Sequence, residues 1–553
     1  MANIARRALF RGAAATVSAV AGSAALGGVT AAPAVADEVV GEGQDALGAR
    51  TTAPTGAMIT PSDPRYAQLT TGNNQRYVAA PSYVKMIKSA PDAAAAITAA
   101  YRAGKRVSVR SGGHCFSNFV CNPDVQVILD CSEMTYVGYD PAMRAFAVEP
   151  GARLLSVYEA LYKGWGVTLP GGVCYGVGAG GHIAGGGYGL LSRRNGLVVD
   201  HLYAVEVVTV DASGTARIVR ATREPNDPNR DLWWAHTGGG GGNFGVVTRY
   251  WLRSPNAPGG SAATPENQLV SPPSHVLMHI QGIPWSQLDE AKFSRLVKNF
   301  GAWHEANSAP DSPQRNLSSI LNVYSKASGM LNLVTQVDAG VPDAAAMLDT
   351  YLNQVLDGVT TARAASRKLP WLQAASLIGT INTTLNDPTL RGAHKSAYMR
   401  TNFTDAQLAS LYASMTAADY TNPRAMLILF SFGGQVNAVA PDATAIPQRS
   451  SAFKMLYQTF WNSAAEDSTH IAWLRTLYGN VHAATGGVPG LDGQTDGCYI
   501  NYPDTDMADP AQNTSGVPWQ RLYYKGNYAR LQQVKARWDP SDYFRHSMSV
   551  KQV

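Results

Sequence analysis

The sequence predicts an α+β protein of two domains, and three observations support this prediction. The chain has 553 residues, whereas a single hydrophobic core stops growing near ~250–300 residues. Helix-like and strand-like patterns alternate over residues 82–254, as in a domain with helices packed on sheets. Prolines interleaved with Gly and Asn then mark a linker, and a second set of amphipathic and alternating segments follows. We therefore expect one domain over 60–255 and another over 256–484.

Each predicted element of the first domain follows from its local pattern. Residues 92–103 are rich in Ala and contain no breaker before Gly104, which predicts a helix. Arg106–Arg110 alternates with the period of a strand. Similar patterns predict strands at Val125–Leu129, Ala145–Val148 and Gly166–Pro170, a helix at Leu154–Lys163, and a hairpin joining Val205–Val210 to Thr215–Val219. Strands that alternate with helices in this way predict parallel crossover units.

The second domain and the C-terminal segment are predicted in the same way. Amphipathic spacing predicts a helix over Gln287–Glu305, and apolar runs predict strands at Ser319–Tyr324 and Ala425–Phe430. A Gly-rich break at 486–490 marks the beginning of a last segment, 485–553. This segment contains a strand-like run, Cys498–Tyr502, and a basic helical stretch, Asn527–Trp538.

The first 36 residues have the pattern of an export signal rather than of folded structure. Arg6 and Arg7 precede a weakly hydrophobic stretch of Ala and Gly, and 34–36 reads Ala-Val-Ala, a small-x-small cleavage pattern. Paired arginines in this position are typical of twin-arginine export, which predicts a secreted protein that crosses the membrane already folded. A membrane anchor is disfavoured, because Gly and Thr dilute the apolar run. A disordered Ala-rich tail is the alternative.

Charge and cysteine content exclude several classes of protein. The formal net charge is +5, and we find no Lys/Arg run typical of nucleic-acid binding. Five cysteines in so long a chain do not form a disulfide scaffold, and without a paired Cys-x-x-Cys no zinc site is predicted. One disulfide among Cys115, Cys121 and Cys131 stays open as an alternative.

Three glycine-rich loops carry the strongest functional signal. The first is 110–115, Arg-Ser-Gly-Gly-His-Cys, directly after a predicted strand. The second, 170–189, contains Cys174 and ten glycines, and the third, 238–248, reads Gly-Gly-Gly-Gly-Gly-Asn-Phe-Gly-Val-Val-Thr. Glycines let the backbone approach a ligand closely and turn its N–H groups onto phosphate oxygens. We therefore expect one large anionic cofactor to lie across the three loops.

These loops, together with the motif Tyr-x-Asn-Tyr-Pro-Asp at 499–504, resemble those of the berberine-bridge-enzyme-like flavoprotein oxidases. That family belongs to the wider fold family of vanillyl-alcohol oxidase and p-cresol methylhydroxylase. The resemblance runs from about residue 64 to the C-terminus and is strongest to bacterial oxidases of antibiotic biosynthesis and to glucooligosaccharide oxidases. It implies a two-subdomain FAD-binding domain, to which 485–553 returns, and a substrate domain with an antiparallel sheet backed by helices.

The resemblance also implies the cofactor and its attachment. FAD would be held covalently by His114, on its 8α-methyl carbon, and by Cys174, as a thioether to flavin C6. A double tether keeps the cofactor from being lost outside the cell and allows an open site that accepts a bulky substrate. The remaining positions that match the family's FAD contacts are Arg110, Ser111, Gly112, Gly113, Cys115, Gly180, Gly185, Gly186, Asn243, Val247, Asn501 and Tyr502. His182 is either a further FAD contact or a structural residue.

Alcohol oxidation needs a base for the hydroxyl proton, and Tyr499 is the candidate. An unperturbed tyrosine has a pKa near ~10, so a neighbour must lower it. The flavin edge or a second tyrosine could do so, and Tyr188 and Tyr398 are the candidates for this role. If 498–502 is a strand, Tyr499 and Asn501 face one side and Tyr502 the other.

The predicted function is oxidation of an alcohol to a carbonyl, with O2 as the electron acceptor and H2O2 as a product. The substrate is expected to be a bulky small molecule, namely a sugar hydroxyl or a polyketide alcohol of a secondary metabolite. The mostly apolar runs at 319–324 and 425–432 favour a metabolite. The alternatives are an oligosaccharide oxidase that makes a lactone, an oxidative ring-closing enzyme, a related dehydrogenase with another acceptor, and a flavin carrier without turnover.

Overall fold

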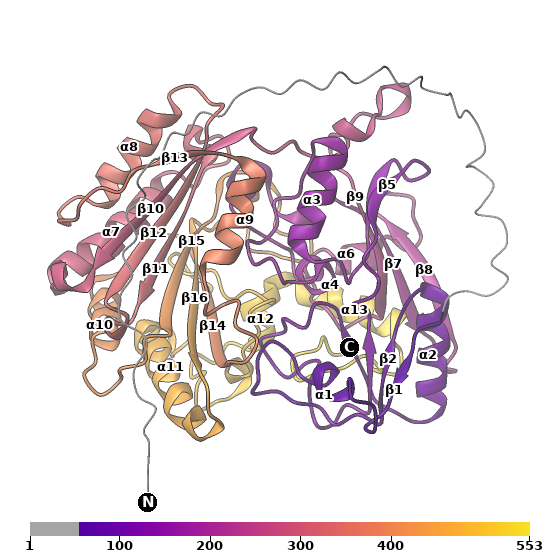
Figure 1. Cartoon of the computed structure of the whole chain (residues 1–553). Helices are drawn as coiled ribbons and strands as arrows, with labels where there is room; N and C mark the ends of the chain where they lie inside the picture. Colours follow the sequence, from indigo (N-terminus) through magenta and orange to yellow (C-terminus); the bar gives the residue numbers. More distant parts are fainter. Residues whose placement is uncertain (1–54) are drawn as a thin grey trace, which may run out of the picture. The chain divides into compact units, whose positions relative to one another are not determined.

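The computed structural model describes residues 55–553 and has an α+β architecture with three sheets (Figure 1). The predicted export signal, residues 1–36, lies outside the described residues. The first sheet has the order β1-β2-β4-β3, the second β5-β6-β9-β7-β8, and the third β13-β10-β12-β11-β15-β16-β14. In residues 55–553 no helix is both long and apolar enough to span a bilayer.

The first sheet contains the parallel strands that the sequence predicts. It is formed by β1 (Met58–Ile59), β2 (Tyr83–Met86), β3 (Val107–Arg110) and β4 (Val127–Asp130). Strands β2 and β3 both pair with β4 in parallel. The connection from β2 to β3 contains helix α2 (Ala90–Arg102), which begins where the Ser89 side chain accepts a hydrogen bond from the Asp92 backbone N–H, 3.2 Å away. Helix α1 (Tyr66–Leu69) precedes this sheet.

The second sheet is antiparallel, so the prediction of parallel crossovers is wrong for this part of the chain. Its strands are β5 (Val137–Asp140), β6 (Ala145–Val148), β7 (Leu202–Val210), β8 (Ala216–Thr222) and β9 (Val246–Leu252). The helices between them are α3 (Leu154–Trp165), α4 (Ala179–Ala184), α5 (Ser192–Asn195) and α6 (Arg230–Ala235). The predicted strand Gly166–Pro170 is also wrong, because only Thr168 makes a bridge there, to Val270.

The third sheet is a seven-stranded antiparallel sheet backed by helices. Its strands are β10 (His275–Pro284), β11 (Leu317–Tyr324), β12 (Met330–Asp338), β13 (Arg367–Pro370), β14 (Arg391–Met399), β15 (Ala425–Ser431) and β16 (Phe453–Trp461). Helices α7 (Glu290–Ala306), α8 (Ala344–Val355), α10 (Asp405–Met415) and α11 (Asp467–Val481) cover its outer face (Figure 1). Helix α9 (Trp371–Ile381) packs instead against α3.

The last helices, α12 (Trp519–Tyr524) and α13 (Tyr528–Trp538), pack against the third glycine loop. The Lys535 ammonium donates to the Asn243 carbonyl at 2.8 Å, and the Tyr524 hydroxyl donates to the Gly239 carbonyl at 2.9 Å. The C-terminal segment therefore fixes the loop from behind. The exact domain limits at 255 and 484 stay predictions.

Candidate active site

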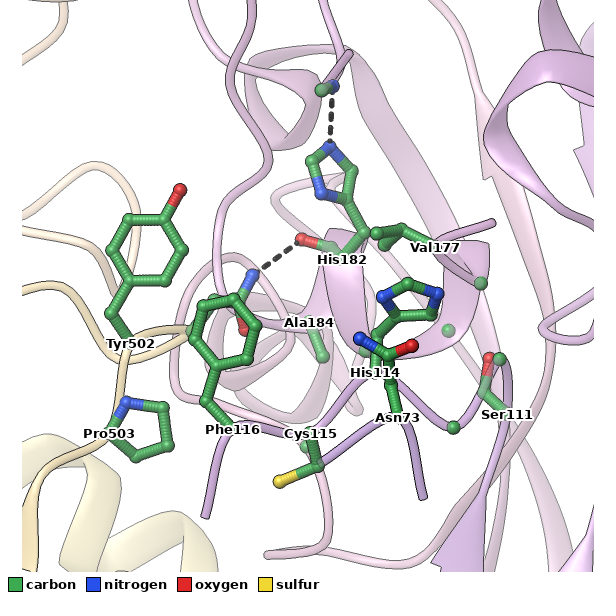
Figure 2. A pocket seen from close by; sticks show the side chains of 18 of the residues that line it. Asn73, Ser111, His114, Cys115, Phe116, Val177, His182, Ala184, Tyr502 and Pro503 are labelled. Carbon is green, nitrogen blue, oxygen red and sulfur yellow. Dashed lines mark hydrogen bonds between the residues drawn. The ribbon is translucent and has the colours of Figure 1, made fainter. Parts of the chain in front are cut away.

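A cavity of about 360 Å³ opens where the glycine loops meet the inner face of the seven-stranded sheet. Figure 2 shows part of its lining, with His114, Phe116 and Tyr502 around the same space. Fourteen of the predicted site residues line it: Arg110, Ser111, Gly112, Gly113, His114, Cys115, Cys174, Gly180, Tyr188, Asn243, Val247, Tyr499, Asn501 and Tyr502. Segments separated by almost 400 residues in the chain thus share one cavity.

The first two glycine loops contact each other directly through their backbones. A Cβ on Gly112 would lie 2.3 Å from the Gly178 nitrogen, and a Cβ on Gly178 would lie 2.4 Å from the Gly112 nitrogen. A Cβ on Gly176 would lie 2.9 Å from Nε2 of His114. Glycine is required at these positions because real Cβ atoms do not approach other atoms so closely. The imidazole of His114 therefore lies against the segment that carries Cys174, two residues before Gly176.

Burial controls the protonation of both predicted attachment residues. Desolvation, followed by the Arg153 charge, lowers the pKa of His114 to about 4, so its imidazole is neutral near pH 7. Burial raises the pKa of Cys174 to about 11, so this residue is a thiol rather than a thiolate. The sulfur of Cys115 points away from the His114 ring (Figure 2). All five cysteines are free, so the structure contains no disulfide among Cys115, Cys121 and Cys131.

Gly185 and Gly186 are not among the residues that line the cavity, but they pack against residues that are. A Cβ on Gly185 would lie 2.1 Å from Oδ1 of Asn501. Gly186 has a φ of +120°, and a Cβ there would lie 3.0 Å from Ile446 and 3.7 Å from the Tyr499 ring. These glycines therefore make room for the 499–502 segment, and their contact with the cofactor stays a prediction.

The predicted strand at Cys498–Tyr502 is a turn, so the assignment of its two faces is wrong. The Tyr502 backbone N–H donates to the Tyr499 carbonyl at 2.9 Å, which closes the turn. This turn brings Tyr499 and Tyr502 to the same side, with ring centroids 5.0 Å apart, and both line the cavity. The local β-propensity of Cys-Tyr-Ile-Asn-Tyr is overruled by the turn.

The hydroxyl of Tyr499 accepts two hydrogen bonds. The Gly187 backbone N–H and the Asn501 side-chain amide each donate to it at 3.1 Å. Burial raises the pKa of Tyr499 above its ordinary value, and these two hydrogen bonds oppose that rise. Both donors are aimed at the atom that becomes negative when the proton leaves.

A residue that the sequence prediction missed, Lys454 on β16, lies directly beside Tyr499. Its Nζ is 3.4 Å from the ring centroid of Tyr499 and 3.4 Å from that of Tyr188. It is 4.6 Å from the ring centroid of Tyr398. This nitrogen is buried without a hydrogen-bond partner, and burial lowers the pKa of Lys454 well below its ordinary value. The available signal was a lone Lys in the otherwise apolar strand Phe-Lys-Met-Leu-Tyr, 453–457.

The other two predicted tyrosines differ in their access to the cavity. Tyr188 lines it, and its hydroxyl is 2.6 Å from that of Tyr502. Tyr398 is fully buried behind the lining, and its hydroxyl has no partner. Its ring lies 6.2 Å from that of Tyr499. Tyr398 therefore lies beside Lys454 but does not line the cavity.

His182 lines the cavity and forms two structural hydrogen bonds (Figure 2). Its Nε2 accepts from the Gly172 backbone N–H at 3.1 Å, and its carbonyl accepts from the Asn501 amide at 3.1 Å. Burial, followed by the Lys454 charge, lowers the pKa of His182 to about 4. This histidine thus joins the Gly172 loop to the Tyr499 turn.

The wall that the seven-stranded sheet and α9 contribute is mostly apolar. Its polar groups are amide side chains, which can both donate and accept hydrogen bonds. The apolar residues are Ile320, Val334, Ile378, Ile381, Leu385, Ile428, Phe430, Leu456 and Phe460, and the amides are Asn322, Asn382, Asn386 and Gln458. Such a wall suits an uncharged molecule with a hydrophobic body and several hydroxyl groups.

Comparisons with known proteins agree with this geometry. A family model described as an FAD binding domain matches residues 81–220, and one described as berberine and berberine like matches 498–551. The aclacinomycin-N/aclacinomycin-A oxidase of Streptomyces galilaeus is 48% identical over 547 residues, which is 98% of either chain. The chain belongs to the berberine-bridge-enzyme-like FAD oxidases.

Other members of this family are similar along most of the chain. The hexose oxidase of Chondrus crispus is 30% identical over 523 residues, covering 88% of this chain and 93% of its own. The solved structure of aclacinomycin oxidoreductase has a TM-score of 0.86 and 47% identity, and covers 90% of this chain and all of its own. The structure of the glycopeptide hexose oxidase DBV29 complexed with teicoplanin has a TM-score of 0.85 at 47% identity, with the same coverage. The protein is therefore an FAD-dependent oxidoreductase of the oxidase type.

The residues present fit an FAD. The cavity is lined by the Ser111–Cys115 loop, by the Gly172–Gly181 segment and by the sheet face, so a single large ligand in it would contact all three. A Cβ on Gly181 or Gly241 would meet no atom within 4 Å, which leaves open space at both glycine loops. The first two loops and Asn243 would hold the cofactor, and His114 and Cys174 lie where side chains can reach it.

Proposed function

We propose that this oxidase carries its FAD on both His114 and Cys174 and oxidises a hydroxyl group of a glycosylated secondary metabolite to a carbonyl. The observation that carries the proposal is the pairing of a base site, Tyr499 beside Lys454, with a mostly apolar wall that bears amides. When bound, FAD accepts a hydride from the alcohol carbon and passes two electrons to O2, which gives H2O2.

Covalent attachment is supported by the chemistry of both side chains. His114 is neutral at physiological pH, so a ring nitrogen has a free lone pair for bond formation. Cys174 must lose its proton as its bond forms, since burial keeps it a thiol. Each attachment removes two hydrogen atoms in total, one from the side chain and one from the cofactor, and O2 takes them up as H2O2.

Tyr499 is the proposed base for the substrate hydroxyl. Its phenol oxygen already accepts two hydrogen bonds, and Nζ of Lys454 lies against its ring, so a phenolate that forms there is stabilised on three sides when Lys454 is protonated. Because Lys454 has no other partner, its charge becomes favourable mainly when a phenolate forms beside it. Tyr188 flanks the other side of the ammonium and positions it.

The substrate class follows from the wall and from the relatives. Aclacinomycin oxidase and glycopeptide hexose oxidase are named for glycosylated natural products, and hexose oxidase for a free sugar. The aliphatic side chains of the wall would pack against an aglycone, while the amides would bind sugar hydroxyls. A free-carbohydrate oxidase is the second candidate, favoured by the four amides alone.

One experiment tests the cofactor and the base together. The purified protein is precipitated in acid, and the yellow colour is expected to stay with the pellet; FAD in the supernatant would refute the covalent attachment.

Anaerobic flavin reduction is then followed with aclacinomycin A, D-glucose and maltose. We expect reduction by at least one of these, and a loss of about 100-fold or more in Tyr499→Phe. An unchanged reduction rate in that variant would refute the base assignment.

The site of action is a separate proposal. We propose that the protein is exported by the twin-arginine route, on the strength of Arg6-Arg7 and the Ala-Val-Ala pattern at 34–36. Arg6→Lys/Arg7→Lys should keep the flavoprotein inside the producing cell, and export of this variant at the normal level would contradict the proposal.

A further inference from the structure

One buried amide on the cavity wall has an unused hydrogen-bonding end. Gln458 on β16 is 0% exposed and lines the cavity. Its Nε2 is 3.0 Å from Nδ1 of His394, while its Oε1 has no partner. A buried polar atom left without a hydrogen bond costs roughly 1–3 kcal/mol, and such atoms in folded proteins call for an explanation.

His394 holds this amide in place. Its ring is stacked on Phe116, with centroids 3.9 Å apart and planes at 15°. Burial lowers the pKa of His394 to about 3, so the ring is neutral and one nitrogen accepts the bond from Gln458. Exchanging the oxygen and nitrogen of the Gln458 amide would leave its NH2 end free instead. In either orientation one end of the amide is unused.

The strand register places Gln458 at a defined distance from the base. Residues that pair across neighbouring strands form a row of the sheet. Lys454 pairs with Tyr398 of β14 and with Phe430 of β15, and its Nζ lies over the ring of Tyr499. Four residues along β16, Gln458 lies opposite His394 and Met426. At ~3.3 Å per residue these two rows are ~13 Å apart.

An apolar row separates the two polar rows. Leu456 lies opposite Ile428, and both line the cavity. Asn322, opposite Ile428 on β11, adds an amide at the edge of this row. The wall therefore has a reacting end, an apolar middle and a polar far end.

We propose that Gln458 forms a distal subsite that binds a hydroxyl group of the substrate, one that lies beyond the apolar row, ~13 Å along β16 from Lys454. This inference rests on the proposed function and sharpens it: the substrate is a neutral glycoside longer than one sugar ring, with an apolar portion in its middle and a hydroxyl at its far end. Gln458 is a specificity-determining residue that contacts the substrate but takes no part in the proton or hydride step.

The test compares substrates of different length in matched variants. Gln458→Met keeps the length of the side chain and removes its polar end, and Gln458→Asn keeps the amide but withdraws it by one methylene. Leu456→Met, on the same face of β16, is the control, because it changes the shape of the wall without removing a hydrogen bond. Melting temperature and the flavin absorbance spectrum report whether each variant is folded and loaded.

D-Glucose, maltose, maltotriose and aclacinomycin A serve as probes, in steady-state turnover and in titrations of the flavin absorbance of the holoenzyme. We expect Gln458→Met to weaken binding of the longest effective probe about tenfold, which corresponds to ~1.4 kcal/mol. KM should rise, kcat should stay the same, and the constants for glucose should not change. Leu456→Met keeps the hydrogen bond at the far end, so it should weaken binding of the longest effective probe much less than Gln458→Met does.

The subsite proposal would be overturned if Gln458→Met weakened binding of glucose and of the longer probes equally. It would also be overturned if this variant bound every probe as the wild type does, since a trapped water would then satisfy the free end of the Gln458 amide. The proposed function fails in a different way, namely when wild-type flavin is reduced by none of the probes. The titrations still report the dependence of binding on Gln458 in that case.

Discussion

Replacing Lys454 by Met should move the pH dependence of the reaction upward. Nζ of Lys454 lies 3.4 Å from the ring centroid of Tyr499, roughly 4 Å from the phenol oxygen, and although burial lowers the pKa of Lys454, a phenolate formed beside it favours the ammonium. At an effective dielectric constant of ~20, a charge pair at this distance interacts by about 4 kcal/mol. Since 1.36 kcal/mol corresponds to one pKa unit, loss of the ammonium should raise the apparent pKa of the base by about two to three units.

The assay is anaerobic flavin reduction at saturating substrate from pH 5 to pH 10. The wild-type rate should rise with pH through the apparent pKa of the base, because the phenolate is the active form. In Lys454→Met the same rise should occur about two to three units higher, so the rate near pH 7 falls about 100- to 1000-fold. Methionine retains the apolar stem of lysine, so the packing against Phe432 and the tyrosines is largely kept.

Leu456→Met, two residues along β16, is the matched control, and its pH profile should not move. If Lys454→Met is folded, carries covalent flavin and shows the wild-type pH profile, the ammonium does not act on Tyr499 and the reasoning is wrong. A uniform fall in rate at every pH would also contradict it, because that would indicate misplaced groups rather than a changed pKa.

Three further predictions follow from the site. His114→Ala and Cys174→Ala should each keep flavin in the acid pellet through the remaining link, whereas the double variant should release FAD; release from a single variant would contradict two links. Gly185→Ala places a Cβ 2.1 Å from Oδ1 of Asn501, and should lower kcat about tenfold and Tm by a few degrees, since overpacking costs ~1–3 kcal/mol; unchanged values would show that Asn501 can move freely. Buried neutral histidines bind fewer protons in the folded than in the unfolded state, so Tm should fall as pH is lowered from about 6.5 towards 4, and a flat Tm over that window would contradict this. Burial lowers the pKa to about 4 or about 3 in seven histidines: His114, His182, His236, His304, His394, His482 and His546.

Local patterns predicted most of the elements near the cofactor cavity. The Ala-rich stretch became α2, and the alternating Arg106–Arg110 became β3, which leads directly into the loop with His114. These predictions succeeded because helix and strand periodicity is a property of neighbouring residues. The direction of strand pairing was predicted less well. The strands that follow β4 form an antiparallel sheet. Partners such as β6 and β9 lie about 100 residues apart, so no local pattern could indicate their relative direction.

The turn at 499–502 shows where local pattern misleads. Its residues have high β-propensity, yet each side chain is held by a distant partner: Tyr499 by Gly187, and Tyr502 by Tyr188. Tertiary contacts overrule intrinsic preference in such cases. The sequence therefore identified both tyrosines but did not predict that their side chains lie on the same side of the turn.

By itself, the sequence determined the glycine loops and hence the cofactor, and it predicted the pair His114 and Cys174, because these signals lie within short stretches of chain. Only the tertiary structure decided the chemistry around the base. The ammonium of Lys454, the ring of Tyr499 and the unused amide of Gln458 meet through sheet register and a long-range turn. The pKa of a group depends on burial and on neighbouring charges, and these are set by segments that the chain brings together only on folding.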